Sequence, residues 1–457
     1  MNSADRSSSS LILLVMAGLG GFLYGVDFGV IAAAEPYMKA MNIYTDGQIS
    51  HIVGAVLLGG LVSSITAGWL CDFFGRKKMI VASAVMFLVA IPIVSLSLGS
   101  YPFLYAGRVL QGMSAGYMAV VMPMYLTETL PPAIRGRGTG VFQFCLGLGL
   151  VVAAGAGCLV ATWYGASDKA DEVNRMAAWG ANFWWTMIPV AVLFFGSLRL
   201  RESPVWLKKK SGGFEVSQLR SLNGSSGTPK PETRNAETLL RRRYVIPFLL
   251  ACLVLTFNKT TGMSSFTSYL VTILHSAGFE GIYANWGQLA VKLTNMLVTI
   301  AAAALVDRKG RTWLLRVGTG GMTLGLAAIG CVFFAIERFG VEANNFTGLL
   351  TLFSFSFMQV FYALGPGLCV WLVLSELMPT RIRANGMAFA LFMNQLVAWG
   401  LASWFRPWVK AWGWSSMFFF FAFNGVLYFV TSLFIPETKG KSLDELENLF
   451  GGDCKNR

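Results

Sequence analysis

Four ionisable residues stand inside long apolar runs of the sequence. Asp27 lies in the run that begins near residue 11, and Arg108, Lys259 and Lys292 lie in later runs of the same kind. A charge at the centre of a membrane span costs about 2.5–3.5 kcal/mol on insertion scales, so such residues usually face the protein interior and have a partner. We therefore expect these four side chains to surround an internal polar site.

The opposite charges of Asp27 and Arg108 predict a buried ion pair between the first and the fourth apolar runs. Contact with an arginine favours the ionised carboxylate, whereas loss of that contact favours protonation. A pair that opens and closes could therefore take up and release a proton, which predicts a proton-coupling role for Asp27 and Arg108. A purely structural ion pair is the alternative.

Lys259 and Lys292 are then two uncompensated ammonium groups inside the spans, because Asp27 and Arg108 cancel each other. An anionic solute, such as a sugar acid or another hydroxylated carboxylate, would supply the missing partner. Alternatively, both side chains snorkel to the outer surface or are neutral against backbone carbonyls. For Lys292 taken alone, extension to the surface is the favoured hypothesis.

The composition indicates a membrane protein that can hold such residues. The 457-residue chain is 55% hydrophobic and only 13% charged, whereas soluble proteins carry about 25% charged residues. A bilayer core requires about 20 apolar residues per helix, and the chain offers twelve such segments. We predict spans near 11–34, 50–71, 78–98, 101–125, 138–163, 180–198, 244–270, 284–306, 313–336, 347–373, 384–405 and 413–435.

Other functional classes are disfavoured by the same sequence. The net charge of +13 does not indicate nucleic-acid binding, because the basic residues form short clusters between apolar runs. The seven cysteines are scattered, the two histidines are too few for a ligand cluster, and no phosphate-loop motif occurs. We therefore expect no enzymatic activity, no metal and no cofactor, with a proton gradient as the energy source.

The predicted spans divide the chain into four parts. Residues 1–198 and 244–435 each form a six-helix bundle, 199–243 forms a polar linker with short helices, and 436–457 forms a tail. Basic residues are concentrated at the N-terminus, in the loops after even-numbered spans and in the tail, which predicts that both termini and the linker are cytoplasmic. The loops after odd-numbered spans hold only Lys39, Lys169, Arg175, Arg338, Arg406 and Lys410.

A repeated loop pattern relates the two halves. The sequence Asp72-Phe-Phe-Gly75-Arg76 follows the second span, and Asp307-Arg-Lys-Gly310-Arg311 follows the eighth. Glycine permits a tight turn, while aspartate and arginine can cap and clamp neighbouring helix ends. Many transporter folds consist of two such repeats around a central site, so the pattern predicts two pseudo-symmetric bundles.

Further motifs follow in order along the chain. They are Gly107-Arg108-Val-Leu-Gln-Gly112, Pro123-Met-Tyr125-Leu-Thr-Glu128, Pro131-Pro132-Ala-Ile-Arg135-Gly136, Arg201-Glu202-Ser203-Pro204-Val-Trp206-Leu207, Ser375-Glu376-Leu-Met-Pro379-Thr380-Arg381-Ile-Arg383 and Pro436-Glu437-Thr438-Lys439-Gly440-Lys441-Ser442-Leu443. Together with the repeated loops, they make the chain resemble the sugar porter family of the major facilitator superfamily over nearly its whole length. The resemblance implies an all-α membrane protein with twelve transmembrane helices in two six-helix bundles.

The resemblance also implies roles for charged residues. In that family an aspartate in the first span marks the proton-coupled members, and its arginine partner is at the position of Arg108. Cytoplasmic charges form ion pairs between the two bundles that favour the outward-open state. The residues to which this second role is assigned are Asp72, Arg76, Glu128, Arg135, Glu202, Asp307, Arg311, Glu376, Arg381 and Glu437.

Solute-binding residues follow from the same resemblance, because the family binds a sugar with amides and an aromatic ring from several spans. The candidates here are Tyr24, Gln143, Asn258, Lys259, Ser264, Lys292, Asn295, Trp371, Asn394 and Gln395. Some positions depart from the family pattern: Lys259 replaces an amide, Leu150 stands where a polar group is common, and Gly365-Pro366 is displaced by two residues. These departures argue against ordinary hexose recognition.

We therefore predict a secondary active transporter that takes up a monosaccharide-like solute, or a sugar acid or other hydroxylated carboxylate, by proton symport. A nutrient receptor that does not transport and a proton-driven efflux protein on the same fold are the alternatives. The expected partners are the solute, the proton and the lipid bilayer, with no nucleic acid, and the protein is expected to be a monomer. The short loops and tail favour a bacterial inner membrane.

Overall fold

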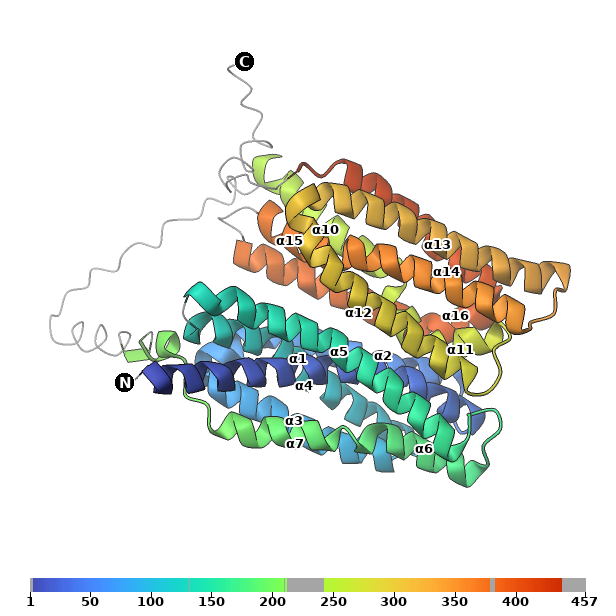
Figure 1. Ribbon diagram of the computed structural model, residues 1–457, viewed down its shortest axis with the longest axis horizontal. Helices are drawn as coiled ribbons and strands as arrows, with labels where there is room; N and C mark the ends of the chain where they lie inside the picture. The colour runs from blue at the N-terminus through green and yellow to red at the C-terminus, as the bar shows by residue number, and fades with distance from the viewer. Residues whose placement is uncertain (1–2, 131, 209, 212–241, 379–382, 438–457) are drawn as a thin grey trace, which may run out of the picture.

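The computed structural model describes residues 3–130, 132–208, 210–211, 242–378 and 383–437. Every regular element in these ranges is a helix (Figure 1). Most of the predicted linker and the predicted tail beyond residue 437 lie outside the described residues, so the domain boundaries there remain predictions.

Seven helices make up the first half of the molecule, which is the lower half in Figure 1. They are α1 (Ser3–Ala40), α2 (Asp46–Phe74), α3 (Arg76–Leu96), α4 (Tyr101–Thr129), α5 (Pro132–Tyr164), α6 (Glu172–Trp184) and α7 (Met187–Leu198). Helix α1 packs along α5, and α4 packs against both α2 and α3. Helices α6 and α7 follow one another as a single broken crossing, Glu172–Leu198.

The second half has a matching set of helices. They are α10 (Arg242–Thr260), α11 (Met263–Ser276), α12 (Tyr283–Lys309), α13 (Arg311–Phe339), α14 (Asn345–Leu364), α15 (Pro366–Leu377) and α16 (Arg383–Leu433). Helix α13 packs against α14 and α16, and α10 packs against α16. The two halves meet where α2 packs on α16, α1 on α11 and α5 on α12.

The predicted twelve crossings are present, although two of them are joined in one helix. Eleven described helices are long and apolar enough to span a membrane, and the last, Phe389–Leu433, has 45 residues. At 1.5 Å per residue it would measure about 68 Å, roughly twice the ~30 Å bilayer core. The backbone is non-helical at Gly413 (φ 80°, ψ 165°), which divides the helix into two crossings. The predicted all-α fold is confirmed.

Three spans predicted as continuous helices are broken within the membrane. Besides the α6–α7 break, α10 gives way to α11 at Gly262, which has a left-handed backbone (φ 79°), and α14 gives way to α15 at Gly365. The apolar pattern runs through these breaks without interruption, so hydropathy alone did not predict them. Broken helices of this kind commonly form the solute sites of transporters.

The repeated loops have the same geometry in both halves. Gly75 (φ 95°, ψ 166°) precedes α3 and Gly310 (φ 91°, ψ 163°) precedes α13. A carboxylate accepts hydrogen bonds from the first backbone N–H groups of each helix: Glu202 in the first half and Glu437 in the second. Negative charge at a helix N-terminus is stabilising, so each glutamate caps its helix and the internal symmetry extends to this detail.

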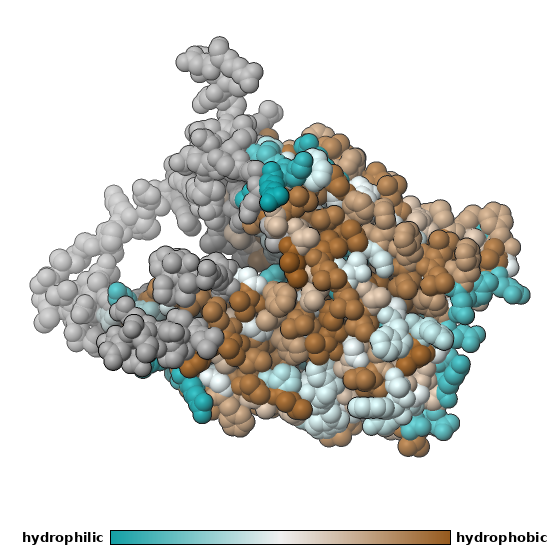
Figure 2. Space-filling model, in the orientation of Figure 1, coloured by the Kyte–Doolittle hydropathy of each residue, from teal (hydrophilic) through white to brown (hydrophobic). Residues whose placement is uncertain are grey.

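We call the end of the molecule that carries these two loops the terminal end, and the opposite end, which carries Gly413, the far end. Figure 2 shows hydrophobic residues over the middle of the visible face and hydrophilic residues gathered at the far end, on the right. Hydrogen bonds and ion pairs made by Glu35, Asp46 and Ser50, together with the hydrogen bond between Asp168 and Gly281, join the two halves at the far end. The structure therefore represents a state that is closed at the far end.

Candidate functional site

Asp27 of α1 and Arg108 of α4 form a buried ion pair. Oδ1 of Asp27 lies 3.6 Å from Nη1 of Arg108, and both side chains are almost fully shielded from solvent. The same Nη1 donates a hydrogen bond of 2.7 Å to Gln111, and the guanidinium lies 5.7 Å from the centre of the Phe183 ring. The pair thus lies in the interior, as the sequence predicted, while its role in proton coupling remains a prediction.

A polar cavity of about 220 Å³ lies between the two halves. Helices α1 and α5 line it from the first half, and α10, α11, α12, α14 and α15 line it from the second. Seven of the predicted solute-binding residues line this cavity: Tyr24, Gln143, Lys259, Ser264, Lys292, Asn295 and Trp371. The sequence therefore identified most of the polar lining.

Three predicted solute-binding residues lie elsewhere. Asn258 is buried and donates a hydrogen bond to the carbonyl of Pro366, and Asn394 is buried and donates to the carbonyl of Leu255. Gln395 faces Gly60 of α2, where the two halves pack together. Asn258 joins α10 to α15 and Asn394 joins α16 to α10 through these hydrogen bonds, and neither asparagine lines the cavity.

The cavity also has polar lining that sequence reasoning missed. Thr267, Thr299, Gln359 and Tyr362 all contribute to its wall. Thr267 and Thr299 each lie about one helical turn beyond a predicted residue, Ser264 and Asn295, so helical spacing could have found them. Gln359 is an isolated amide inside an apolar run, and this was the feature of the sequence that could have marked it as a site residue.

The two lysines point into the cavity and have no acidic partner. Lys259 donates a hydrogen bond of 3.2 Å from Nζ to Oγ of Ser264, across the break between α10 and α11. Lys292 is only 4% exposed and lines the cavity, so it does not snorkel to the outer surface, and the hypothesis favoured for it alone is wrong. Within the described residues, neither lysine forms an ion pair with a carboxylate.

Arg76 and Glu437 at the terminal end make contacts within their own halves. Arg76 lies 2.8 Å from Glu128 and 3.2 Å from Asp72, and the cap formed by Glu437 on α13 also stays within one half. The side chains of Arg135, Asp307, Glu376 and Arg381 lie outside the described residues. Ion pairs between the halves, in a state closed at the terminal end, remain a prediction.

A second buried charge cluster, which the sequence did not predict, joins the halves at the far end. Arg406 of α16 lies 2.6 Å from Glu35 of α1 and 2.8 Å from Asp46 of α2. Its backbone N–H donates to Ser50, and Thr272 of α11 donates to Glu35. Glu35 and Arg406 fall just outside the predicted spans 11–34 and 384–405, so neither is among the ionisable residues predicted inside the membrane.

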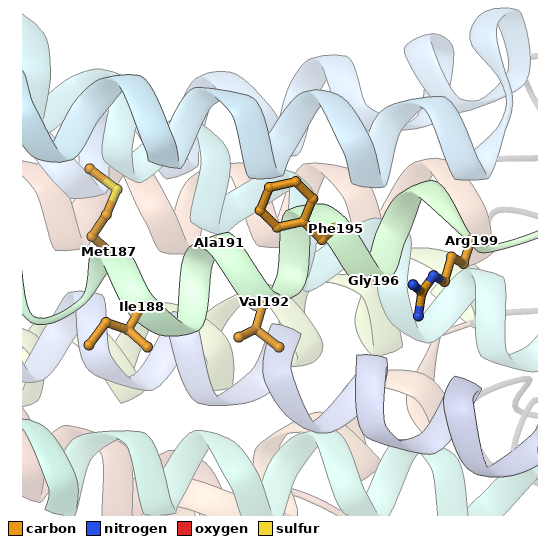
Figure 3. Close-up of a pocket in the computed structure, with 7 residues that line it drawn as sticks. All are labelled: Met187, Ile188, Ala191, Val192, Phe195, Gly196 and Arg199. Carbon is orange, nitrogen blue, oxygen red and sulfur yellow. The ribbon is translucent and has the colours of Figure 1, made fainter.

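A larger hollow lies on the outer surface of α7 and does not belong to the central site. Met187, Ile188, Ala191, Val192, Phe195, Gly196 and Arg199 line it. In Figure 3 Met187 and Phe195 extend to one side of the helix and Ile188 and Val192 to the other. Ile188 and Phe195 are mostly exposed, which fits a helix that faces lipid.

The fold first defines a class of protein. The chain superposes on a D-xylose-proton symporter with a TM-score of 0.77 and 21% identity, covering 94% of this chain and 99% of that one. It also superposes on the xylose transporter XylE from Escherichia coli in a partially occluded inward open conformation, with a TM-score of 0.74, 21% identity and coverage of 95% and 100%. The architecture is therefore the twelve-helix major facilitator fold.

Residues 13–450 match the family model described as "Sugar (and other) transporter", so the chain belongs to that family. The arabinose-proton symporter of Bacillus subtilis (strain 168) is 26% identical, with 96% of this chain and 95% of that protein covered. The galactose-proton symporter of Escherichia coli (strain K12) is 28% identical, with coverage of 98% and 96%. The protein is a membrane transporter and not an enzyme, as predicted.

Proposed function

We propose that this protein is a secondary active transporter that couples proton movement to the uptake of a small, monosaccharide-like solute. The observation that carries the proposal is the buried Asp27–Arg108 pair beside a polar cavity at the junction of the two halves. The proton-symporter names of the relatives from Bacillus subtilis and Escherichia coli support the same function.

The cavity has the chemistry to hold a polyhydroxylated solute. Gln143, Asn295 and Gln359 offer amides that can both donate and accept hydrogen bonds, and Ser264 offers a hydroxyl. Trp371 and Tyr24 provide flat apolar faces for the C–H surface of a sugar ring. The volume of about 220 Å³ is below the range of about 300–1,000 Å³ for drug-sized ligands, so a single monosaccharide or a sugar acid is a suitable size.

The position of Asp27 on α1 supports proton coupling. Tyr24, Gly25 and Phe28 of the same helix line the cavity, whereas Asp27 faces Arg108 of α4. A shift of α1 that accompanies solute binding would change the distance between carboxylate and guanidinium. Lengthening that contact favours protonation of Asp27 and shortening it favours release, so solute and proton binding are coupled through one helix.

The proposal includes an orientation and a location. The concentration of basic residues in the loops and tail of the terminal end supports placing that end in the cytoplasm. The far end would then face outward, and the structure would be closed to the outside. A bacterial inner membrane and a monomeric transporter are part of the same proposal.

Replacement of Asp27 tests the function. In proteoliposomes we expect Asp27→Asn to abolish proton-driven accumulation of solute while exchange of solute across the membrane continues, because the amide cannot take up the proton. The measurement is uptake and counterflow against a panel of neutral sugars and their acids. Asp171→Asn is the matched control, since Asp171 is exposed and does not line the cavity.

The outcomes separate the candidate functions. Accumulation that is unchanged in Asp27→Asn would refute the coupling role. Solute movement driven outward by a proton gradient would indicate efflux, and binding without counterflow would indicate a receptor.

A further inference from the structure

The buried charges of the described chain are paired with one exception. Arg76, Arg108 and Arg406 each lie within 3.6 Å of a carboxylate, and Asp27 and Glu35 are two of the partners. Lys292 is the one buried charged residue in the described ranges that has no such partner. Lys259, which lines the same cavity, has only the hydroxyl of Ser264.

The cavity therefore carries an excess of positive charge. Its described lining includes two lysines and no aspartate or glutamate. Asp27 and Glu35 cannot neutralise the lysines, because each is already held by an arginine. A cation deep in a membrane protein is stable when a counter-ion or water surrounds it, so a site of this kind favours an anion as its occupant.

We propose that the solute is a hydroxylated monocarboxylate, and that its carboxylate binds Lys259 and Lys292. This inference rests on the proposed function and specifies the solute class of the same site. A carboxylate has two oxygens, so each ammonium can donate to one of them. The hydroxyl groups of the solute then bind Gln143, Asn295 and Gln359, which line the same cavity.

The charges of the solute and the proton determine which gradient drives accumulation. A monocarboxylate carries one negative charge and the symported proton carries one positive charge, so their joint transfer is electroneutral. A neutral sugar with one proton would move one net positive charge. Accumulation of the proposed solute therefore depends on the pH gradient and not on the membrane potential.

Matched pairs of solutes test the binding inference. The purified protein is titrated with galactose and galacturonate, and with glucose, glucuronate and gluconate, while quenching of tryptophan fluorescence reports binding. We expect a sugar acid to bind more tightly than its neutral counterpart. Lys259→Gln and Lys292→Gln should each weaken acid binding by about 10-fold or more, because a charge-assisted hydrogen bond is lost, and should change binding of the neutral sugar by less than about 3-fold.

Two further variants control this experiment. Arg338→Gln removes a positive charge from an exposed position outside the cavity and should leave both affinities unchanged. Lys292→Arg keeps the charge and should retain the preference for the acid. Equal losses for acid and neutral sugar in both lysine variants, or tighter binding of the neutral sugar by the native protein, would overturn the inference.

Proteoliposomes with an imposed potassium diffusion potential test the charge balance. For the acid we expect accumulation to follow the pH gradient and to be unchanged by an inside-negative potential. A potential of about 59 mV would raise the accumulation of a neutral sugar 10-fold. If a neutral sugar accumulates in this way and the acids do not, the inference fails and the proposed function stands. If a proton gradient drives no solute, the proposed function fails.

Discussion

At the scale of single residues, charged and amide side chains of the cavity have different roles in binding the solute. Lys259 and Lys292 supply positive charge, whereas Gln143, Asn295 and Gln359 supply groups that suit hydroxyls. A neutral hydrogen bond contributes about 0.5–1.5 kcal/mol, and one to a charged group about 1.5–3 kcal/mol. The lysines should therefore set which class of solute binds, and the amides should set how tightly any hydroxylated solute is held.

Gln359 is the residue on which we test this division. We expect Gln359→Leu to weaken binding of neutral sugars and of their acids alike, by about 3- to 10-fold, because one neutral hydrogen bond is lost. Titration by tryptophan fluorescence measures both affinities. Gln288→Leu is the control, since Gln288 is equally buried but does not line the cavity. A loss confined to the acids would show that Gln359 contacts the carboxylate instead.

Residue types predicted some of the site well and some of it poorly. A charged side chain inside an apolar run is stable only where it faces the protein interior or a cavity. Asp27, Arg108 and the two lysines could therefore be identified as candidate site residues without a structure. Amides are less constrained, because a backbone carbonyl can satisfy them: Asn394 pairs with that of Leu255. Which face of its helix an amide occupies depends on tertiary packing, which spacing along one chain does not determine.

At the scale of helices, the break at Gly262 brings two functional side chains together. Lys259 lies in the last turn of α10 and Ser264 in the first turn of α11, and they form a hydrogen bond across the break. A β-carbon on Gly262 would lie 2.8 Å from the ring of Phe421. Phe421 packs among Phe266 and Phe405, so its ring has little room to move.

We expect Gly262→Ala to disturb both stability and transport. The left-handed backbone costs alanine about 1–2 kcal/mol, and the contact with Phe421 adds to this. Displacement of Lys259 from Ser264 should also lower the transport rate of the sugar acid. This loss should be larger than the loss expected from the lower stability alone, which the change in melting temperature measures. Thermal unfolding in detergent and uptake in proteoliposomes are the two measurements. Gly400→Ala is the control, because nothing lies within 4 Å of its added β-carbon, and wild-type behaviour of both variants would contradict the argument.

The helices show why a sequence predicts crossings better than breaks. About 20 apolar residues suffice to mark a crossing, and the twelve predicted spans correspond to the observed helices. The breaks at Gly262 and Gly365 interrupt hydrogen bonding without interrupting the apolar pattern. Glycine at both positions permits a break, but many of the 50 glycines of the chain lie inside intact helices, so glycine alone does not locate one.

At the scale of the whole molecule, a charge cluster joins the two halves at the far end. Capping glutamates at the terminal end bind helices of their own half, whereas Arg406 at the far end binds Glu35 and Asp46 of the other half. Alternating access requires one half to move against the other around the site. The Glu35–Arg406–Asp46 cluster must therefore separate before the far end can open, and it stabilises the closed state while it is intact.

Replacement of Arg406 should shift the molecule toward the state open at the far end. Arg406→Gln leaves the carboxylate of Glu35 buried without its ion partner in the closed state, at a cost of about 3–5 kcal/mol, whereas opening would expose that carboxylate to water. A cost of this size changes the ratio of the two states by about 100-fold or more. Spin labels at the exposed positions Lys39 and Arg338, one in each half, should then lie farther apart when their separation is measured by pulsed electron resonance.

Lys410→Gln is the matched control, because Lys410 is exposed and lies 3.8 Å from Asp46, and an exposed pair contributes about 0–1 kcal/mol. An unchanged separation in Arg406→Gln would mean that apolar packing between the halves, and not this charge cluster, keeps the far end closed.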